Sequence, residues 1–191
     1  ASRFFSVVVL ALAVACGPAP RPTTIAVTPV GTAMGATQTA MIGPAGGSVS
    51  SLDGLVTLTV PANAVSAMTA FTVSAVEATG PGATRAFRLG PEGTRFTTPA
   101  TVTMKYSAED AAGSAPELFT VGFQDGKGQW RGATTTVDES AKTISAPTTH
   151  LSDWSLLRGV VLRPPSASVK VKESVALSVQ ICDFSKTPID D

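Results

Sequence analysis

The chain has 191 residues, of which 43% are hydrophobic, 6% aromatic and 15% charged. Fourteen basic and fourteen acidic residues cancel, so no net charge draws in nucleic acid or an anionic membrane surface, and we expect no nucleic-acid partner. The abundance of Thr, Val, Gly and Pro disfavours helices and suits short strands joined by tight turns.

An apolar run occupies residues 4–15, directly after Arg3. A run of about a dozen residues is too short for a spanning helix, which needs roughly 20. It does match the hydrophobic part of a secretory signal peptide, which follows a positive charge and precedes a small-residue cleavage site. We therefore expect residues 1–15 to be a signal peptide.

The end of this run resembles the bacterial lipoprotein signal, the lipobox, over the residues Leu12-Ala13-Val14-Ala15-Cys16-Gly17. Ala13 stands where that family usually has Leu. The resemblance implies that Cys16 becomes the first mature residue and carries the lipid that binds the membrane. In a Gram-negative host it implies the outer membrane or cell surface, because Gly17 is not an inner-membrane retention Asp. The alternative is an ordinary signal peptide with a chance cysteine.

Residues 16–39 join the lipidated cysteine to the first clear strand, through a stretch rich in Pro, Thr, Ala and Gly. Pro keeps such a stretch extended and Gly keeps it from packing. We expect a flexible tether here. Residues 23–30 hold just enough apolar character for one short strand.

Strand patterns recur from residue 40 to residue 158 at the short spacing typical of a sandwich or barrel. No window shows a sustained period near 3.6, so no long helix is expected. The expected strands lie at residues 48–51, 55–60, 71–76, 86–89, 101–106, 118–123, 134–137 and 143–146, and residues 147–157 are expected as the closing strand. The sequence predicts an all-β, antiparallel β-sandwich.

Two turn sequences mark hairpins between these strands. Asp53-Gly54 is a strong hairpin signal, and the polar run 124–128 around Asp125-Gly126 is another. Both look faintly like calcium loops, but neither is followed by further oxygen ligands at the spacing that calcium needs. We interpret both as turns.

Two stretches resemble the ZU5 family: Gly46-Gly47-Ser48-Val49 followed by residues 54–64, and residues 89–96 followed by Pro99-Ala100-Thr101-Val102. Ala100 stands where that family usually has Val. The resemblance implies a β-sandwich that serves as an interaction or structural module and is not an enzyme. It covers about residues 42–157.

Residues 159–191 are predicted to be a linker and the start of a further module. A proline joint at Arg163-Pro164-Pro165 precedes a clean two-residue alternation of apolar side chains, at Val169, Val171, Val175, Leu177 and Val179. The pattern resembles the first two strands of a bacterial immunoglobulin-like repeat. About thirty residues rarely close a core unaided, so we interpret this module as truncated.

The residues able to carry chemistry are few. The sequence has only one histidine and two cysteines, too few for a credible zinc site. We expect no metal and no cofactor. Cys182 has no partner within the chain once Cys16 is acylated, so in an oxidising compartment its partner would lie elsewhere. Glu92 is either a ligand in a partner interface or, as we favour, an acceptor of backbone N–H groups in its own turn.

His150-Leu151-Ser152 is the one candidate for catalysis. Self-cleaving proteins of several kinds, some ZU5 domains among them, cut between the last two residues of a His-hydrophobic-Ser/Thr sequence. Strand alternation would place His150 and Ser152 on one face, where the imidazole can accept the hydroxyl proton and the oxygen can attack the Leu151 carbonyl. The alternative is a strand residue with local hydrogen bonds. Trp154 and Leu156 are predicted core residues in either case.

Three functions follow from these observations. The first is a lipid-anchored extracytoplasmic module with a structural, adhesive or protein-interaction role on a bacterial surface, with a protein or polysaccharide ligand. The second is a self-cleaving domain that cuts between Leu151 and Ser152. The third is an accessory β domain of a secreted hydrolase, in which only Trp130 and Trp154 offer platforms for sugar.

Overall fold

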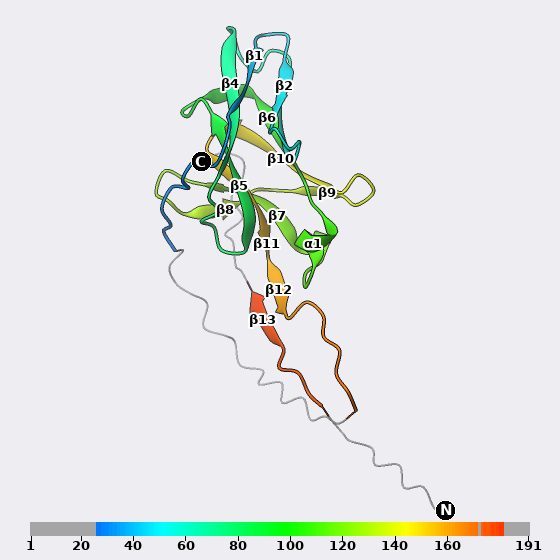
Figure 1. Cartoon of the computed structure of the whole chain (residues 1–191). Coiled ribbons are helices and arrows are strands. Elements are labelled where there is room, and N and C mark those ends of the chain that lie inside the picture. Colours follow the sequence, from blue (N-terminus) through cyan, green and yellow to red (C-terminus); the bar gives the residue numbers. More distant parts are fainter. Residues whose placement is uncertain (1–25, 172, 182–191) are drawn as a thin grey trace, which may run out of the picture.

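The computed structural model describes residues 26–171 and 173–181. The expected signal peptide, Cys16 and Cys182 lie outside these residues. Two antiparallel sheets pack face to face, and a smaller two-stranded sheet projects from one end (Figure 1). The prediction of an all-β, antiparallel sandwich is confirmed.

The larger sheet has six strands in the order β1 (Gln38–Ile42), β4 (Thr69–Val76), β5 (Ala83–Gly90), β11 (Asp153–Arg158), β7 (Phe119–Gln124) and β8 (Trp130–Gly132). The second sheet has the order β2 (Gly47–Ser50), β3 (Val56–Val60), β6 (Arg95–Lys105), β10 (Thr143–His150) and β9 (Thr136–Asp138). Two short helical turns, α1 (Ala108–Ala111) and η1 (Pro116–Leu118), lie in the connection from β6 to β7. They are the only helical elements in the described part of the chain.

The main core lies between the two sheets, and the alternation in the sequence predicts much of it. In β3, Val56, Leu58 and Val60 are buried, while the threonines between them are not. The same two-residue period buries Val102 and Met104 in β6. Apolar side chains on one face of each strand therefore pack against those of the facing sheet, as a sandwich requires.

Both predicted hairpins are present. β2 and β3 pair across the Asp53-Gly54 turn, where the carboxylate of Asp53 accepts a hydrogen bond from the Leu55 N–H at 3.0 Å. Gly54 has a φ of +66°, a conformation that glycine adopts without steric cost. β7 and β8 pair across the second turn, where Asp125 accepts from the N–H groups of Lys127 and Gln129, each at 2.9 Å.

The prediction of one closing strand over residues 147–157 is wrong, because this stretch forms parts of two strands in different sheets. β10 ends at His150, which pairs with Arg95 in the five-stranded sheet. β11 begins at Asp153, which pairs with Arg88 in the six-stranded sheet. Leu151 and Ser152 therefore form the crossover from one layer to the other.

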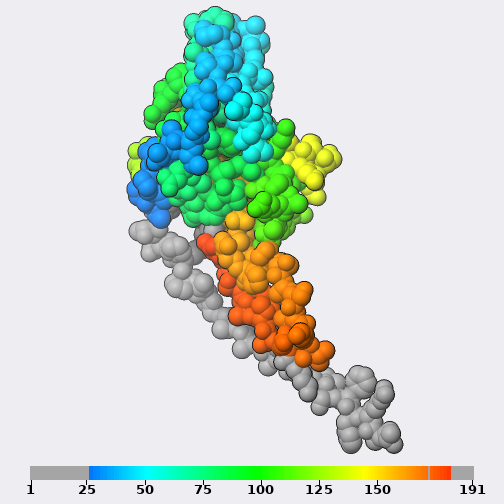
Figure 2. Space-filling view, in the orientation of Figure 1, coloured from blue at the N-terminus to red at the C-terminus, as the bar shows by residue number. Residues whose placement is uncertain are grey.

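Residues 26–34 run along the outer face of the six-stranded sheet, and we call them the N-terminal strap. Figure 2 shows this segment, in blue, lying against the green strands. Its backbone is held by the Thr28 N–H, which donates to the Gly128 carbonyl at 2.8 Å, and by the Met34 N–H, which donates to the Ala75 carbonyl at 2.8 Å. The prediction of a flexible tether over residues 16–39 is therefore wrong from residue 27 onward, where Val27 pairs with Gln129.

A second, smaller core lies on the outer face of the same sheet. It consists of Val76, Ala86, Trp130 and Leu157, and the indole N–H of Trp130 donates to the Thr28 hydroxyl of the strap at 3.0 Å. Because of this cluster, β11 is buried on both faces along most of its length. The strap is thus part of the folded domain.

The C-terminal arm is a two-stranded sheet of β12 (Val160–Arg163) and β13 (Ser178–Ile181), which projects from the sandwich (Figures 1 and 2). The backbone of its first strand meets the β6–β7 connection, where the Leu162 N–H donates to the Gly113 carbonyl at 2.6 Å. Val169 and Val171, predicted to lie in a strand, do not, and Val171 is 93% exposed. The arm has no apolar core of its own within the described residues.

Candidate functional site

A groove of about 850 Å³ lies on the outer face of the six-stranded sheet, and we call it the outer groove. Its floor consists of side chains from the middle strands of that sheet, Thr72 and Ser74 of β4, Arg88 of β5 and Asp153 of β11. Alternation explains their position, because their neighbours Val73, Leu89 and Trp154 point into the main core. The floor of the groove is therefore polar, although it lies on a sheet whose other face packs in the main core.

An ion pair between Arg88 and Asp153 is the strongest polar contact of the floor. The guanidinium Nε donates to one carboxylate oxygen at 2.7 Å and Nη2 donates to the other at 2.8 Å, an arrangement typical of strong carboxylate binding. The hydrogen bond to Asp153 raises the pKa of Arg88, against the effect of burial. Nη2 also donates to the Gly31 carbonyl at 2.9 Å, so the same side chain holds the strap.

The strap can approach this closely because residue 31 is glycine. A Cβ atom at Gly31 would lie 2.3 Å from the Glu77 carbonyl oxygen, a distance at which the backbone would have to move. Gln124, at the end of β7, adds a second contact, since its amide donates to the carbonyl oxygens of Thr28 at 2.9 Å and Pro29 at 3.2 Å. The strap therefore forms a fixed wall of the groove.

Two loops form the rest of the wall. The turn after β5 carries Glu92, which is exposed, and is closed by the Thr94 hydroxyl, which donates to the Pro91 carbonyl at 2.7 Å. The β7–β8 hairpin carries Asp125, whose carboxylate is bound by the Arg131 guanidinium at 2.9 Å. Burial acts to raise the pKa of Asp125, but the Gln129 N–H and Arg131 outweigh it and lower the pKa.

His150, Leu151 and Ser152 all line the groove at the crossover between the sheets. The His150 ring packs edge-on against Phe123, with centroids 4.6 Å apart, and its backbone N–H donates to the Thr148 hydroxyl at 3.1 Å. Leu151 is buried, and the Ser152 hydroxyl donates to the Asp153 carbonyl at 3.4 Å. His150 is thus the last residue of β10, and Leu151 and Ser152 form the bend that follows it.

Trp130 and Trp154 are almost fully buried, at 2% and 1% exposure. Trp154 packs in the main core with Leu156, so the prediction that both are core residues is confirmed. Trp130 lies beneath the strap. Neither indole is exposed, so neither presents a face to a sugar.

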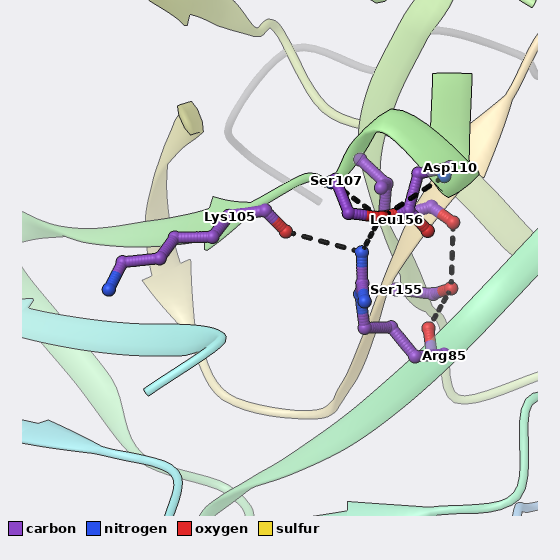
Figure 3. A network of polar contacts seen from close by, with 6 residues as sticks. All are labelled: Arg85, Lys105, Ser107, Asp110, Ser155 and Leu156. Atoms are coloured by element: carbon purple, nitrogen blue, oxygen red, sulfur yellow. Dashed lines mark hydrogen bonds and ion pairs between the residues drawn. The ribbon is translucent and has the colours of Figure 1, made fainter. Parts of the chain in front are cut away.

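A second polar cluster lies at the other end of β5 and links three segments of the chain (Figure 3). The Arg85 guanidinium binds the Asp110 carboxylate in α1 and donates to the Lys105 carbonyl at 3.3 Å. Ser107 and Asp110 cap α1 reciprocally, since the Ser107 N–H donates to the carboxylate at 2.8 Å and the Asp110 N–H donates to the hydroxyl at 3.2 Å. The Asp110 carboxylate, the Ser107 hydroxyl and the Nη2 group of Arg85 all bind other parts of the protein, so we assign the cluster a structural role.

Sequence reasoning identified His150, Ser152 and Glu92 but missed the floor of the groove. The signal was present in β5, where Arg88 interrupts an apolar stretch between Phe87 and Leu89. Its partner Asp153 lies 65 residues away, and nothing in the local pattern connects the two.

Within the described ranges, no group of three or more His, Cys, Asp or Glu side chains is placed to hold a metal ion. The helices of those ranges are all too short to cross a membrane. The sequence matches no protein-family profile, and a search of curated proteins finds no relative.

Proposed function

We propose that this protein is a lipid-anchored extracytoplasmic module with a structural, adhesive or protein-interaction role on a bacterial surface. The observation that carries the proposal is the order of segments along the chain. An apolar run ends at Cys16 in a lipobox-like sequence, and an all-β sandwich follows within a short distance. The ZU5-like motifs within the sandwich favour an interaction module over an enzyme.

The strap sets how far the sandwich can stand from the membrane. Val27 already pairs with Gln129 of the domain, so only the residues between Cys16 and Val27 remain to act as a tether. Fully extended, that stretch spans at most about 40 Å. The outer groove lies at the Asp153 end of β11 and the C-terminal arm follows its Arg158 end, so the groove and the arm lie at opposite ends of this strand.

Metabolic labelling with a palmitate analogue tests the anchor. We expect the full chain, expressed in a bacterial host, to carry the label and to sediment with membranes. Cys16→Ala should abolish both properties, and Cys182→Ala, the matched control, should leave both unchanged. An unlabelled wild-type chain, or a label lost only with Cys182→Ala, would refute the proposal.

Self-cleavage between Leu151 and Ser152 is a second candidate, favoured by the position of these residues at the bend between two sheets. In this reaction His150 takes the Ser152 hydroxyl proton and the oxygen attacks the Leu151 carbonyl carbon. The C–N bond breaks as the ester C–O bond forms, and the Ser152 nitrogen takes up a proton. Water then hydrolyses the ester, which leaves a carboxyl group on Leu151 and a free hydroxyl on Ser152.

Denaturing mass spectrometry of the purified chain tests this reaction. Cleavage would yield two fragments, with a new N-terminus at Ser152, and Ser152→Ala would keep the chain whole. Ser155→Ala is the matched control, because that hydroxyl is buried and donates to the Arg85 carbonyl at 2.6 Å. A single intact mass after days at neutral pH would end this hypothesis.

A further inference from the structure

The floor of the outer groove is the face of a sheet, and this limits what can bind there. β4, β5, β11 and β7 are all interior strands of the six-stranded sheet, each paired on both sides. Their backbone N–H and C=O groups are therefore occupied by the ladders, and a peptide cannot bind by adding a strand, which needs an open edge. A ligand must be recognised by the floor side chains.

Those side chains suit a ligand that carries many hydroxyl groups. The hydroxyls of Thr72 and Ser74 can each donate and accept. The Arg88 side chain, 37% exposed, adds guanidinium N–H donors, and the buried Asp153 holds it in place. Neighbouring hydroxyls of a sugar ring likewise present both donors and acceptors. The strap and the two loops enclose this floor from the sides.

The charges in the groove disfavour a polyanion. Asp153 is neutralised by Arg88, and Asp125 is neutralised by Arg131. Glu92 and Arg95 at the rim carry opposite charges. No excess of either sign remains to attract a charged polymer, so the ligand that fits the groove is uncharged.

The size of the groove and its lack of an exposed indole set the expected affinity. A volume of about 850 Å³ lies within the range of sites that take small ligands, about 300–1,000 Å³, and has room for a short stretch of a polysaccharide. Because both tryptophans are buried, hydrogen bonds must supply the affinity without indole stacking. We expect a dissociation constant on the order of 1 mM, typical of weak sites.

We propose that the outer groove binds a neutral polysaccharide through Thr72, Ser74 and the Arg88–Asp153 pair. The inference deepens the proposed function, because it names the ligand class that a surface module of this kind would meet. It rests on the proposed function only in placing the protein at a bacterial surface, where it would meet a polysaccharide. Binding itself requires the folded sandwich and no lipid.

Affinity electrophoresis of the full chain in native gels tests the proposal. The neutral probes are dextran, mannan and galactan, and alginate is the polyanionic probe. We expect at least one neutral polysaccharide to retard the protein and alginate to have no effect. Thr72→Val combined with Ser74→Ala should weaken that retardation at least tenfold. The matched control, Thr59→Val with Ser48→Ala on the other sheet, should stay within twofold of wild type.

A second variant covers the case in which the double substitution does not fold. Gly126 lies at the mouth of the groove, and an added Cβ there meets no atom within 4 Å, so Gly126→Trp should fold and obstruct the groove. It should also lose retardation. The proposal is overturned if no neutral polysaccharide retards the chain, if alginate alone does, or if both groove variants bind like wild type.

The outcomes separate the two proposals. A chain that carries lipid on Cys16 but is not retarded by any neutral polysaccharide overturns the groove assignment alone. A chain that is retarded but never lipidated overturns the anchor alone.

Discussion

The ion pair between Arg85 and Asp110 gives the most quantitative prediction about stability (Figure 3). Asp110→Asn keeps the shape of the side chain and its ability to cap α1 but removes the negative charge. The Arg85 side chain is only 22% exposed, so its charge would lose its partner in a place that water reaches poorly. A hydrogen bond to a charged group contributes about 1.5–3 kcal/mol. We expect the free energy of unfolding to fall by about 2 kcal/mol.

Urea denaturation and thermal melting measure this loss. For a domain of about 150 residues, 1 kcal/mol shifts the melting temperature by roughly 2–4 °C, so the expected shift is about 4–8 °C. Glu109→Gln is the matched control, since Glu109 is the neighbouring, exposed residue of the same helix. Equal effects of the two substitutions, or a change for Asp110→Asn below about 0.5 kcal/mol, would refute the structural role of the pair.

The pH dependence supplies an independent check. Burial acts to raise the pKa of Asp110, but hydrogen bonds from Ser107 and the Arg85 charge outweigh it and lower the pKa below its usual value. The stability that the ionised carboxylate contributes is therefore fully present above the unfolded pKa, about 3.9, and is lost as the pH falls through the folded pKa. The difference in stability between wild type and Asp110→Asn should shrink below about pH 4.

Two further substitutions test the core and the strap. Leu156→Ala removes a fully buried side chain and should lower the free energy of unfolding, measured by urea denaturation, by about 3 kcal/mol. Leu177→Ala, at an exposed position, should change this free energy by no more than about 0.5 kcal/mol. Equal losses for the two variants would contradict the assignment of Leu156 to the core. Gln124→Ala removes the amide that donates to the Thr28 carbonyl. Loss of one strong hydrogen bond should speed proteolysis of the strap by roughly tenfold. Gln180→Ala, in the exposed arm, is the control. Unchanged proteolysis would show that Gln124 does not hold the strap.

The local features of the fold could be predicted from the sequence because each rests on a few neighbouring residues. Alternation in residues 55–60 identified β3 and the face that it buries. Asp53-Gly54 and Asp125-Gly126 identified two hairpins, since a tight turn needs a residue such as glycine and a side chain that accepts backbone N–H groups. Trp154 and Leu156 were correctly expected in the core.

The crossover at Leu151 and Ser152 could not be predicted in this way. Residues 147–157 show apolar and polar side chains in a pattern that also fits one continuous strand. Whether the chain continues in one sheet or moves to the other depends on which strands are available to pair. His150 pairs with Arg95 and Asp153 pairs with Arg88, and both partners lie far away in the sequence.

The N-terminal strap was missed for a related reason. Residues 26–34 hold only three large apolar side chains, Val27, Val30 and Met34, and the Pro, Thr, Ala and Gly around them are typical of a linker. They are ordered by hydrogen bonds from Gln124, Trp130 and Arg88, side chains that the sequence places about 55 to 105 residues further on. The composition of a segment indicates how much apolar surface that segment can bury by itself. It does not indicate whether side chains from distant segments will bind its backbone.

The sequence by itself thus determined the all-β class, the hairpin turns and the side chains that line the main core, because a two-residue period and turn chemistry are local properties. Only the tertiary structure decided that the His150–Ser152 bend, the strap and the Arg88–Asp153 pair meet in one groove. Each wall of that groove comes from a different part of the chain, and contacts between distant strands, which no short stretch of sequence records, bring them together.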